Sequence, residues 1–216
     1  MKRRFAANIL SAIAIVGVLL ALWPVAQWAY ASASQKQLKS QLAQAQTQAK
    51  THKQNATRKT PTSSTRKQTS RAKLQPIAIR AWPLTRIVSP EIGLDAVVVQ
   101  GLDEDSLRRG PGHEPRSALP GEAGNCVIAA HRNLYGSHFL RVDELLPGSI
   151  ITLQTADASY RYSVIQTFVV ADTETSIKKP PRDPNSPPLL TLFTCTIPRT
   201  ATRVVVTAQL LPADAP

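Results

Sequence analysis

Three residues of types that catalyse acyl transfer stand at the ends of apolar runs in the C-terminal part of the chain. Cys195 closes the run Leu-Thr-Leu-Phe-Thr-Cys, His131 follows Asn-Cys-Val-Ile-Ala-Ala, and Arg203 precedes Val-Val-Val. A Cys thiolate can attack a carbonyl carbon, and an imidazole can carry the proton of a leaving amine. A guanidinium can donate hydrogen bonds to the developing oxyanion or hold the substrate backbone. The spacing of these residues therefore indicates acyl transfer at the ends of neighbouring strands.

The elements that must position these side chains are short strands. Apolar or alternating runs, broken by Gly and Pro, predict strands near 84–89, 95–100, 125–130, 149–154, 159–170, 189–195 and 203–211. Two short helices are expected at 103–109 and 137–146. A turn over 196–202 containing Pro198 would return the last strand alongside Cys195. Many strands with few helices predict an all-β domain, either a closed barrel or a sandwich.

The same residues carry a family resemblance. The segments Asn-Cys-Val-Ile-Ala-Ala-His-Arg and Leu-Thr-Leu-Phe-Thr-Cys, followed by Arg203, resemble the three signature segments of sortases. The stretch from Phe139 to Ile151 also resembles the family's linker after the His strand. The resemblance covers most of 84–211, and its details are most similar to the class D and E members. Ala130 stands before His131 where Gly is frequent in the family.

The resemblance implies a closed eight-stranded β-barrel and a cysteine transpeptidase. Such an enzyme cleaves a Leu-Pro-x-Thr-Gly-like C-terminal sorting signal through a thioacyl-enzyme on Cys195 and transfers the acyl group to an amine acceptor. His131 would be the general acid/base and Arg203 the oxyanion or substrate-orienting group. Thr194 and Asn133 are candidate substrate-positioning residues, although no residue is spaced as a clear third triad member. The Pro-rich loop 171–188 lies where sortases build part of the substrate groove.

The remaining cysteine and histidine residues of the C-terminal part are predicted to be structural rather than catalytic. Cys126 lies in mid-strand and is expected in the core, although a disulfide between Cys126 and Cys195 is conceivable outside the cytoplasm. His113 and His138 are expected at the surface. No Cys/His pairs have ligand spacing, so neither a metal ion nor another cofactor is predicted. The acidic residues of the loop 171–188 are scattered and do not indicate a calcium site.

The N-terminal segment, residues 1–34, predicts a membrane anchor. Lys2, Arg3 and Arg4 precede an uncharged stretch whose apolar centre is Ile9 to Trp23. About 20 apolar residues span a bilayer, and the basic tip would stay in the cytoplasm. A cleaved signal peptide is the alternative, because Ala29-Tyr30-Ala31 and Ala31-Ser32-Ala33 look like cleavage sites. Both interpretations place the domain outside the cytoplasm, and the first makes the chain a single-pass membrane protein.

Residues 35–80 predict a basic stalk between the anchor and the catalytic domain, which is assigned to 81–216. Residues 35–50 suit a short helix or weak coiled-coil seam, whereas 51–75 lack apolar content and are expected to be disordered. Residues 1–80 hold 14 of the 26 basic residues and none of the 14 acidic ones. The net charge of +12 therefore belongs to the tether, which argues against a nucleic-acid partner. The stalk could still attract anionic lipids or wall polymers.

Three classes of function remain open at this stage. The first is a membrane-anchored transpeptidase that joins sorting-signal proteins to a cell-wall or other surface amine. The second is a thiol peptidase or hydrolase on the same fold that releases its substrate to water. The third is a catalytically silent domain that binds the membrane surface, and the intact set of Cys195, His131 and Arg203 argues against it.

Overall fold

Runs of β-branched and aliphatic residues after residue 84 form strands, as their β propensity predicts. The computed structural model describes residues 2–57, 82–183, 185–198 and 200–212. The strands are β1 (Thr85–Ser89), β2 (Leu94–Gln100), β3 (Gly112–His113), β4 (Asn125–Ala129), β5 (Ile150–Gln154), β6 (Ser159–Ala171), β7 (Leu189–Cys195) and β8 (Thr202–Leu210). The α-helices are α1 (Lys2–Thr57) and α2 (Glu104–Arg109), and the 3-10 helices are η1 (Pro90–Ile92), η2 (Val142–Glu144) and η3 (Ser176–Lys178).

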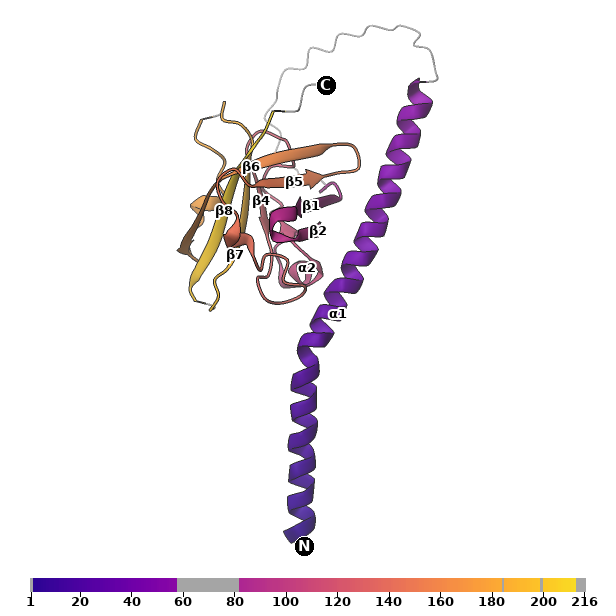
Figure 1. Ribbon diagram of the computed structural model, residues 1–216, viewed down its shortest axis with the longest axis vertical. Coiled ribbons are helices and arrows are strands. Elements are labelled where there is room, and N and C mark those ends of the chain that lie inside the picture. Colours follow the sequence, from indigo (N-terminus) through magenta and orange to yellow (C-terminus); the bar gives the residue numbers. More distant parts are fainter. Residues whose placement is uncertain (1, 58–81, 184, 199, 213–216) are drawn as a thin grey trace.

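The strands close into a barrel in the order β1-β2-β3-β4-β7-β8-β6-β5 (Figure 1). The pairs β2–β3 and β4–β7 are parallel, and the other neighbours are antiparallel. This confirms the closed eight-stranded barrel with few short helices. The expected helix at 137–146 is wrong in extent, because only the 3-10 turn η2 forms there.

Strand β4 is buried on both faces, which explains why its sequence is apolar without alternation. Cys126 and Ile128 belong to the cluster inside the barrel. Val127 and Ala129 pack on the outer face with Phe193, under partly buried side chains from α2 and from η3. The outer face of β4 and β7 is thus covered by side chains of the segments around α2 and η3, and a pocket can form between these segments and the strands.

His113 is buried, so the expected surface position is wrong. Its side chain is only 1% exposed, and its ring stacks on Trp82 with the ring centroids 3.9 Å apart. The Nε2 atom lies 3.1 Å from the carbonyl oxygen of Ala118 and 2.9 Å from the hydroxyl of Ser117. Burial lowers the pKa of His113, an effect partly opposed by the hydrogen bond to the carbonyl of Ala118 and by the negative charge of Glu114. His113 is therefore a buried, packed residue of β3.

Helix α1 is a continuous helix that includes Pro24 and crosses the boundary predicted between residues 34 and 35. Its first half exposes large apolar side chains such as Leu19, Trp23 and Trp28, and the helix is long and apolar enough to cross a bilayer. The helix continues to Thr57, so disorder starting at residue 51 is wrong for 51–57. The rest of the predicted stalk, residues 58–80, lies outside the described residues.

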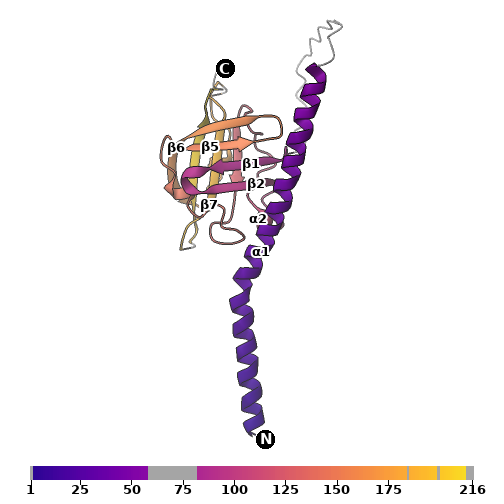
Figure 2. The same ribbon diagram turned by 45° about the vertical axis from the view of Figure 1, so that its right-hand side comes forward.

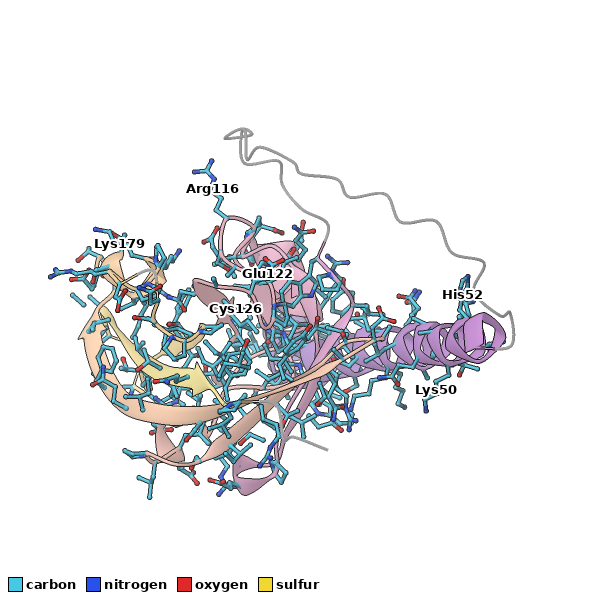
Figure 3. The ribbon with its side chains drawn as sticks, turned by 90° about the horizontal axis from the view of Figure 1, so that it is seen from above. Lys50, His52, Arg116, Glu122, Cys126 and Lys179 are labelled. Atoms are coloured by element: carbon cyan, nitrogen blue, oxygen red, sulfur yellow. The ribbon has the colours of Figure 1, made fainter. Side chains whose placement is uncertain are left out.

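The second half of α1 lies along the barrel, as Figures 1 and 2 both show. Ala31, Gln35 and Leu42 are buried at this contact. Residues 31–46 therefore pack against the barrel, and this contact includes the start of the predicted stalk. Beyond this contact Lys50 and His52 project from the free end of the helix, well away from the barrel that holds Cys126 (Figure 3).

His138 also lies at the contact with α1, and its expected surface position is wrong as well. The Nε2 atom of its imidazole is buried, and the ring packs beside Gly136, which in turn lies against Ala31. Burial, with a smaller contribution from the positive charge of Lys39, lowers the pKa of His138 to about 4. The imidazole is therefore neutral at pH 7.

Candidate active site

Strand register brings Cys195 and Arg203 together. In the antiparallel pair β7–β8, Cys195 is the direct partner of Arg203, and Phe193 is the partner of Val205. Side chains alternate between the two faces of a strand with a period of two. Phe193 and Val205 belong to the cluster outside the barrel, so Cys195 and Arg203 also point to the outer face. Partners placed directly opposite have Cβ atoms roughly 5 Å apart.

His131 reaches the same face from the other side of β7. Strand β4 runs parallel to β7, and Ala129 lies beside Phe193. His131 and Cys195 each follow these partners by two residues, so the same alternation directs both side chains outward. Cys195 thus lies between the imidazole of His131, carried just beyond β4, and the guanidinium of Arg203, carried by β8.

A pocket of about 320 Å³ opens where these strands end. Its wall includes Cys195, His131 and Arg203, and also the candidate positioning residues Thr194 and Asn133. The structure therefore brings all five predicted site residues to one cavity. The other lining residues are Leu102, Leu107, Ala129, Ala130, Arg132, Leu134, Lys178, Phe193 and Thr196.

Two cations lie over one aromatic ring at the base of the pocket. The Cζ atom of Arg203 is 5.5 Å from the ring centroid of Phe193, and the Nζ atom of Lys178 is 5.4 Å from it. Lys178 also forms an ion pair with Glu114 at 3.2 Å. Cation–π contacts of this kind hold a positive group in place without neutralising it. The pocket therefore suits a substrate in which negative charge develops next to the thiol.

Thr194 and Asn133 occupy different positions relative to the cavity. The side chain of Thr194 is on the inner face of β7 and buried, and its hydroxyl donates a hydrogen bond of 2.7 Å to the carbonyl oxygen of Ala130. This bond fixes the end of β4 against the end of β7. Asn133 is exposed on the pocket wall, where its amide is accessible to a bound molecule.

The loop that carries His131 is fixed by contacts to the segment around η2. Arg132 forms an ion pair with Asp143 at 2.6 Å, and its Nε donates to the carbonyl oxygen of Leu140 at 3.3 Å. The guanidinium side chain is only 10% exposed, so this pair is better shielded than most surface ion pairs. The ring of Tyr135 lies 5.2 Å from the imidazole of His131. These contacts restrict the position of the His131 side chain.

Asn125, which sequence reasoning missed, fixes the opposite wall. Its Oδ1 accepts a hydrogen bond from Thr191 at 2.9 Å, and its Nδ2 donates to the carbonyl oxygens of Ile177 and Lys179 at 3.0 and 3.1 Å. These bonds tie η3 to β4 and thereby place Lys178 over the pocket. The only signal in the sequence was a polar residue at the head of an apolar strand.

The turn between Cys195 and Arg203 is held by threonine hydroxyls. The Oγ1 atoms of Thr196 and Thr200 are 2.8 Å apart, and those of Thr200 and Thr202 are 2.6 Å apart. The sequence predicted a turn here but no network. The hydroxyl cluster stabilises the hairpin that keeps Cys195 and Arg203 in register.

Both cysteines are free, in contrast to the alternative of a disulfide. Cys126 points into the barrel and is 1% exposed, as predicted for a core residue. Burial, with a smaller contribution from the charge of Glu122, raises the pKa of the Cys126 thiol well above its usual range. Cys126 is therefore an inert thiol. In the described part of the chain, no group of three or more His, Cys, Asp or Glu side chains could hold a metal ion.

Known proteins share this domain. A family model for the sortase domain matches residues 87–211. Sortase D of Bacillus subtilis (strain 168) is 33% identical over 88 residues, which cover 41% of this chain and 43% of that protein. The aligned part therefore spans less than half of this curated relative.

Solved structures of sortases are similar as well. The Sortase D5 transpeptidase of Clostridium perfringens is 30% identical, with a TM-score of 0.55 over 60% of this chain and 79% of that one. Sortase E of Streptomyces avermitilis is 26% identical, with a TM-score of 0.55 over 61% of this chain and 89% of that one. Sortases of classes A and C are also among the similar structures. With the family model matching more than half of its residues, the chain belongs to the sortase family.

Proposed function

We propose that this protein is a membrane-anchored cysteine transpeptidase that cleaves a Leu-Pro-x-Thr-Gly-like sorting signal and transfers the acyl part to an amine. The observation that carries this proposal is the placement of Cys195 directly opposite Arg203, in a pocket that His131 enters from the neighbouring strand. Membership of the sortase family supports the reaction class. The similar C. perfringens protein is a transpeptidase, which supports transfer to an amine in particular.

In the first half-reaction the thiol of Cys195 gives its proton to His131 as its sulfur attacks the carbonyl carbon of the scissile Thr–Gly peptide bond. Arg203 is directly opposite and donates hydrogen bonds to the oxyanion that forms. His131 then gives a proton to the departing amine as the C–N bond breaks. The product is a thioester between the Thr carbonyl and Cys195, with the Gly-containing fragment released.

In the second half-reaction an amine attacks the thioester carbon. His131 accepts the proton of the attacking amine and gives it to the sulfur as the C–S bond breaks, which restores the thiol of Cys195. Water in place of the amine gives hydrolysis. The exposed amide of Asn133 serves to orient the substrate, while the buried hydroxyl of Thr194 acts on substrate only through the strand ends that it joins.

The apolar half of α1 anchors the chain in the cell membrane as a single span. Its exposed large side chains include Leu20, Trp23 and Val25, and burial in a bilayer would remove them from water. The basic tip, residues 2–4, favours a cytoplasmic N-terminus and an extracytoplasmic barrel. Protein substrates with C-terminal sorting signals and a surface amine would meet there.

The test uses full-length protein in detergent with a peptide containing Leu-Pro-x-Thr-Gly and an added amine. Wild-type protein should give the amine-linked product, and mass spectrometry should detect the thioester on Cys195. Arg203→Ala should lower kcat by about 100-fold or more, the typical cost of losing one oxyanion donor. Arg203→Lys keeps the charge but loses the two-pronged geometry, and it should recover only part of the rate.

Two results would contradict the proposal. Product that forms at the same rate from Cys195→Ala would remove the nucleophile from the mechanism. Product that contains only the carboxylate, whatever the amine concentration, would assign the protein as a thiol peptidase on the same fold.

A further inference from the structure

The contacts between α1 and the barrel follow a fixed order along the helix. Ala31 lies against the loop at Gly136, Gln35 bonds the edge of β2 at Val97, and Gln46 donates to the carbonyl oxygen of Thr155 in the β5–β6 turn. The loop at residue 136 continues from His131, whereas no residue of the β5–β6 turn lines the pocket. The catalytic end of the barrel is therefore the end nearer to the apolar half of α1.

The figures show the same arrangement. In both Figure 1 and Figure 2 the indigo half of α1 continues past the barrel on one side, and the turn between β7 and β8 lies at the barrel's edge on that side. Cys195 and Thr196, at the start of this turn, line the pocket, so the pocket and the apolar half of α1 lie toward the same end of the molecule.

The side chain of Gln35 fixes this orientation. It is only 7% exposed, its Oε1 accepts from the backbone N–H of Val97 at 2.7 Å, and its Nε2 donates to the carbonyl oxygens of Val97 and Arg109 at 3.0 and 2.9 Å. Strand β3 pairs with β2 only at Val99 and Gln100, so the β2 edge at Val97 lacks a strand partner there. The glutamine amide satisfies that edge as a neighbouring strand would.

Charged and apolar contacts reinforce the joint. Lys39 forms an ion pair with Asp95 at 3.0 Å, and Asp95 also accepts a 2.7 Å bond from Arg86 of β1. Leu42, one turn further along α1, is only 3% exposed. The contact thus combines a buried amide, an ion-pair network and apolar burial over residues 31–46. Such an interface holds the barrel at one angle to the helix.

We propose that α1 holds the barrel with its catalytic end against the phospholipid headgroup surface. This inference rests on the proposed membrane anchor. The last aromatic residues of the apolar segment, Trp28 and Tyr30, favour the headgroup level, and Ala31 follows immediately. At a rise of about 1.5 Å per residue, Gln46, which bonds the β5–β6 turn, lies about 22 Å farther along the helix axis from the apolar segment than Ala31.

The rim of the pocket has a composition that fits a headgroup surface. Leu134, on the pocket wall, and Ile197, in the β7–β8 turn, are 38% and 48% exposed. Exposed apolar side chains at such a rim suit the boundary between headgroups and acyl chains. A sorting signal would then meet Cys195 close to the bilayer, without having to extend into solution.

The experiment places a fluorescent probe at each end of the barrel in full-length protein. Cys195→Ala removes the reactive thiol, and buried Cys126 is protected from labelling. Leu134→Cys labels the pocket rim, and Asp157→Cys labels the exposed β5–β6 turn. The proteins are reconstituted in phosphatidylethanolamine–phosphatidylglycerol vesicles that contain a headgroup spin label. Quenching should be at least several-fold stronger at position 134 than at position 157.

A matched variant tests the joint. In the double variant Gln35→Ala with Leu42→Ala, the quenching at position 134 should fall toward that at position 157. The circular dichroism spectrum and vesicle flotation should stay unchanged. Equal quenching of both probes in the parent protein, or stronger quenching at position 157, would overturn the inference and leave the catalytic proposal intact. Protein that does not float with the vesicles would overturn both the anchor and the inference. If wild-type protein, which keeps Cys195, does not cleave the peptide in detergent, the proposed chemistry alone would be overturned.

Discussion

Substitution of Asn125 by Ala should release the wall of the active-site pocket without touching the catalytic residues. The amide of Asn125 is buried and bonds Thr191 on one side and the carbonyl oxygens of Ile177 and Lys179 on the other. Thr191 is 1% exposed, so its hydroxyl would stay buried without a partner, which costs about 1–3 kcal/mol of global stability.

The two bonds from Asn125 to the carbonyl oxygens of Ile177 and Lys179 should determine how often the η3 loop opens. Ile177 is partly buried and Lys179 is exposed, so their carbonyls can turn to water and the loss is about 1 kcal/mol for each bond. Together they correspond to about 2 kcal/mol, which raises the open population of the loop by roughly 30-fold. Hydrogen exchange of the η3 amides of Lys178 and Lys179, which bond Thr175 and Ser176, should accelerate by that factor.

Peptide cleavage should report the same change as weaker substrate binding. Lys178 lines the pocket, so a looser η3 should raise KM while kcat changes little. Thr191→Val is the matched control, because it removes the hydroxyl and keeps both loop bonds. This control should lose stability without faster exchange at η3. Unchanged exchange in Asn125→Ala, or an equal fall of kcat in both variants, would refute the reasoning.

Two further predictions concern buried polar groups. The pKa of His138 is lowered to about 4 in the folded protein, so the unfolded chain binds more protons as the pH falls from about 6.5 to 4. Stability should decrease by up to about 3 kcal/mol over that window, and urea unfolding of His138→Gln should show a flatter profile; an equal slope in this variant would contradict it. Thr194→Val should lower the melting temperature by a few degrees because the carbonyl of Ala130 loses its partner, whereas Thr194→Ser should retain the bond. A Val variant as stable as wild type would assign no stabilising role to this bond.

The sequence predicted those parts of the fold whose residues carry a pattern of their own. Strands β4 and β7 are continuous apolar runs, and β8 is rich in β-branched residues, so their limits agree with the structure within about two residues. Strand β3 has only two residues, Gly112 and His113, and no periodicity can show over that length. The surface position predicted for His113 failed because stacking on Trp82 is a tertiary contact.

The contacts around the site were less accessible to sequence reasoning. Cys195, His131 and Arg203 could be selected because each closes or opens a strand. Gln35 could not, because it stands among similar polar residues of a helix and differs only in facing an incomplete strand edge. Asn125 was missed for a related reason, since its partners are loop carbonyls more than 50 residues away.

The pairing of Cys195 with Arg203 also sets limits on how the protein can be redesigned. The two side chains share a face because β7 and β8 meet in one register, and a shift of that register by one residue would turn Arg203 into the barrel. The turn between the strands is spanned by the hydroxyls of Thr196, Thr200 and Thr202. A peptide-recognition loop inserted in this turn must therefore keep that network, and a single residue added within either strand would move Cys195 and Arg203 to opposite faces.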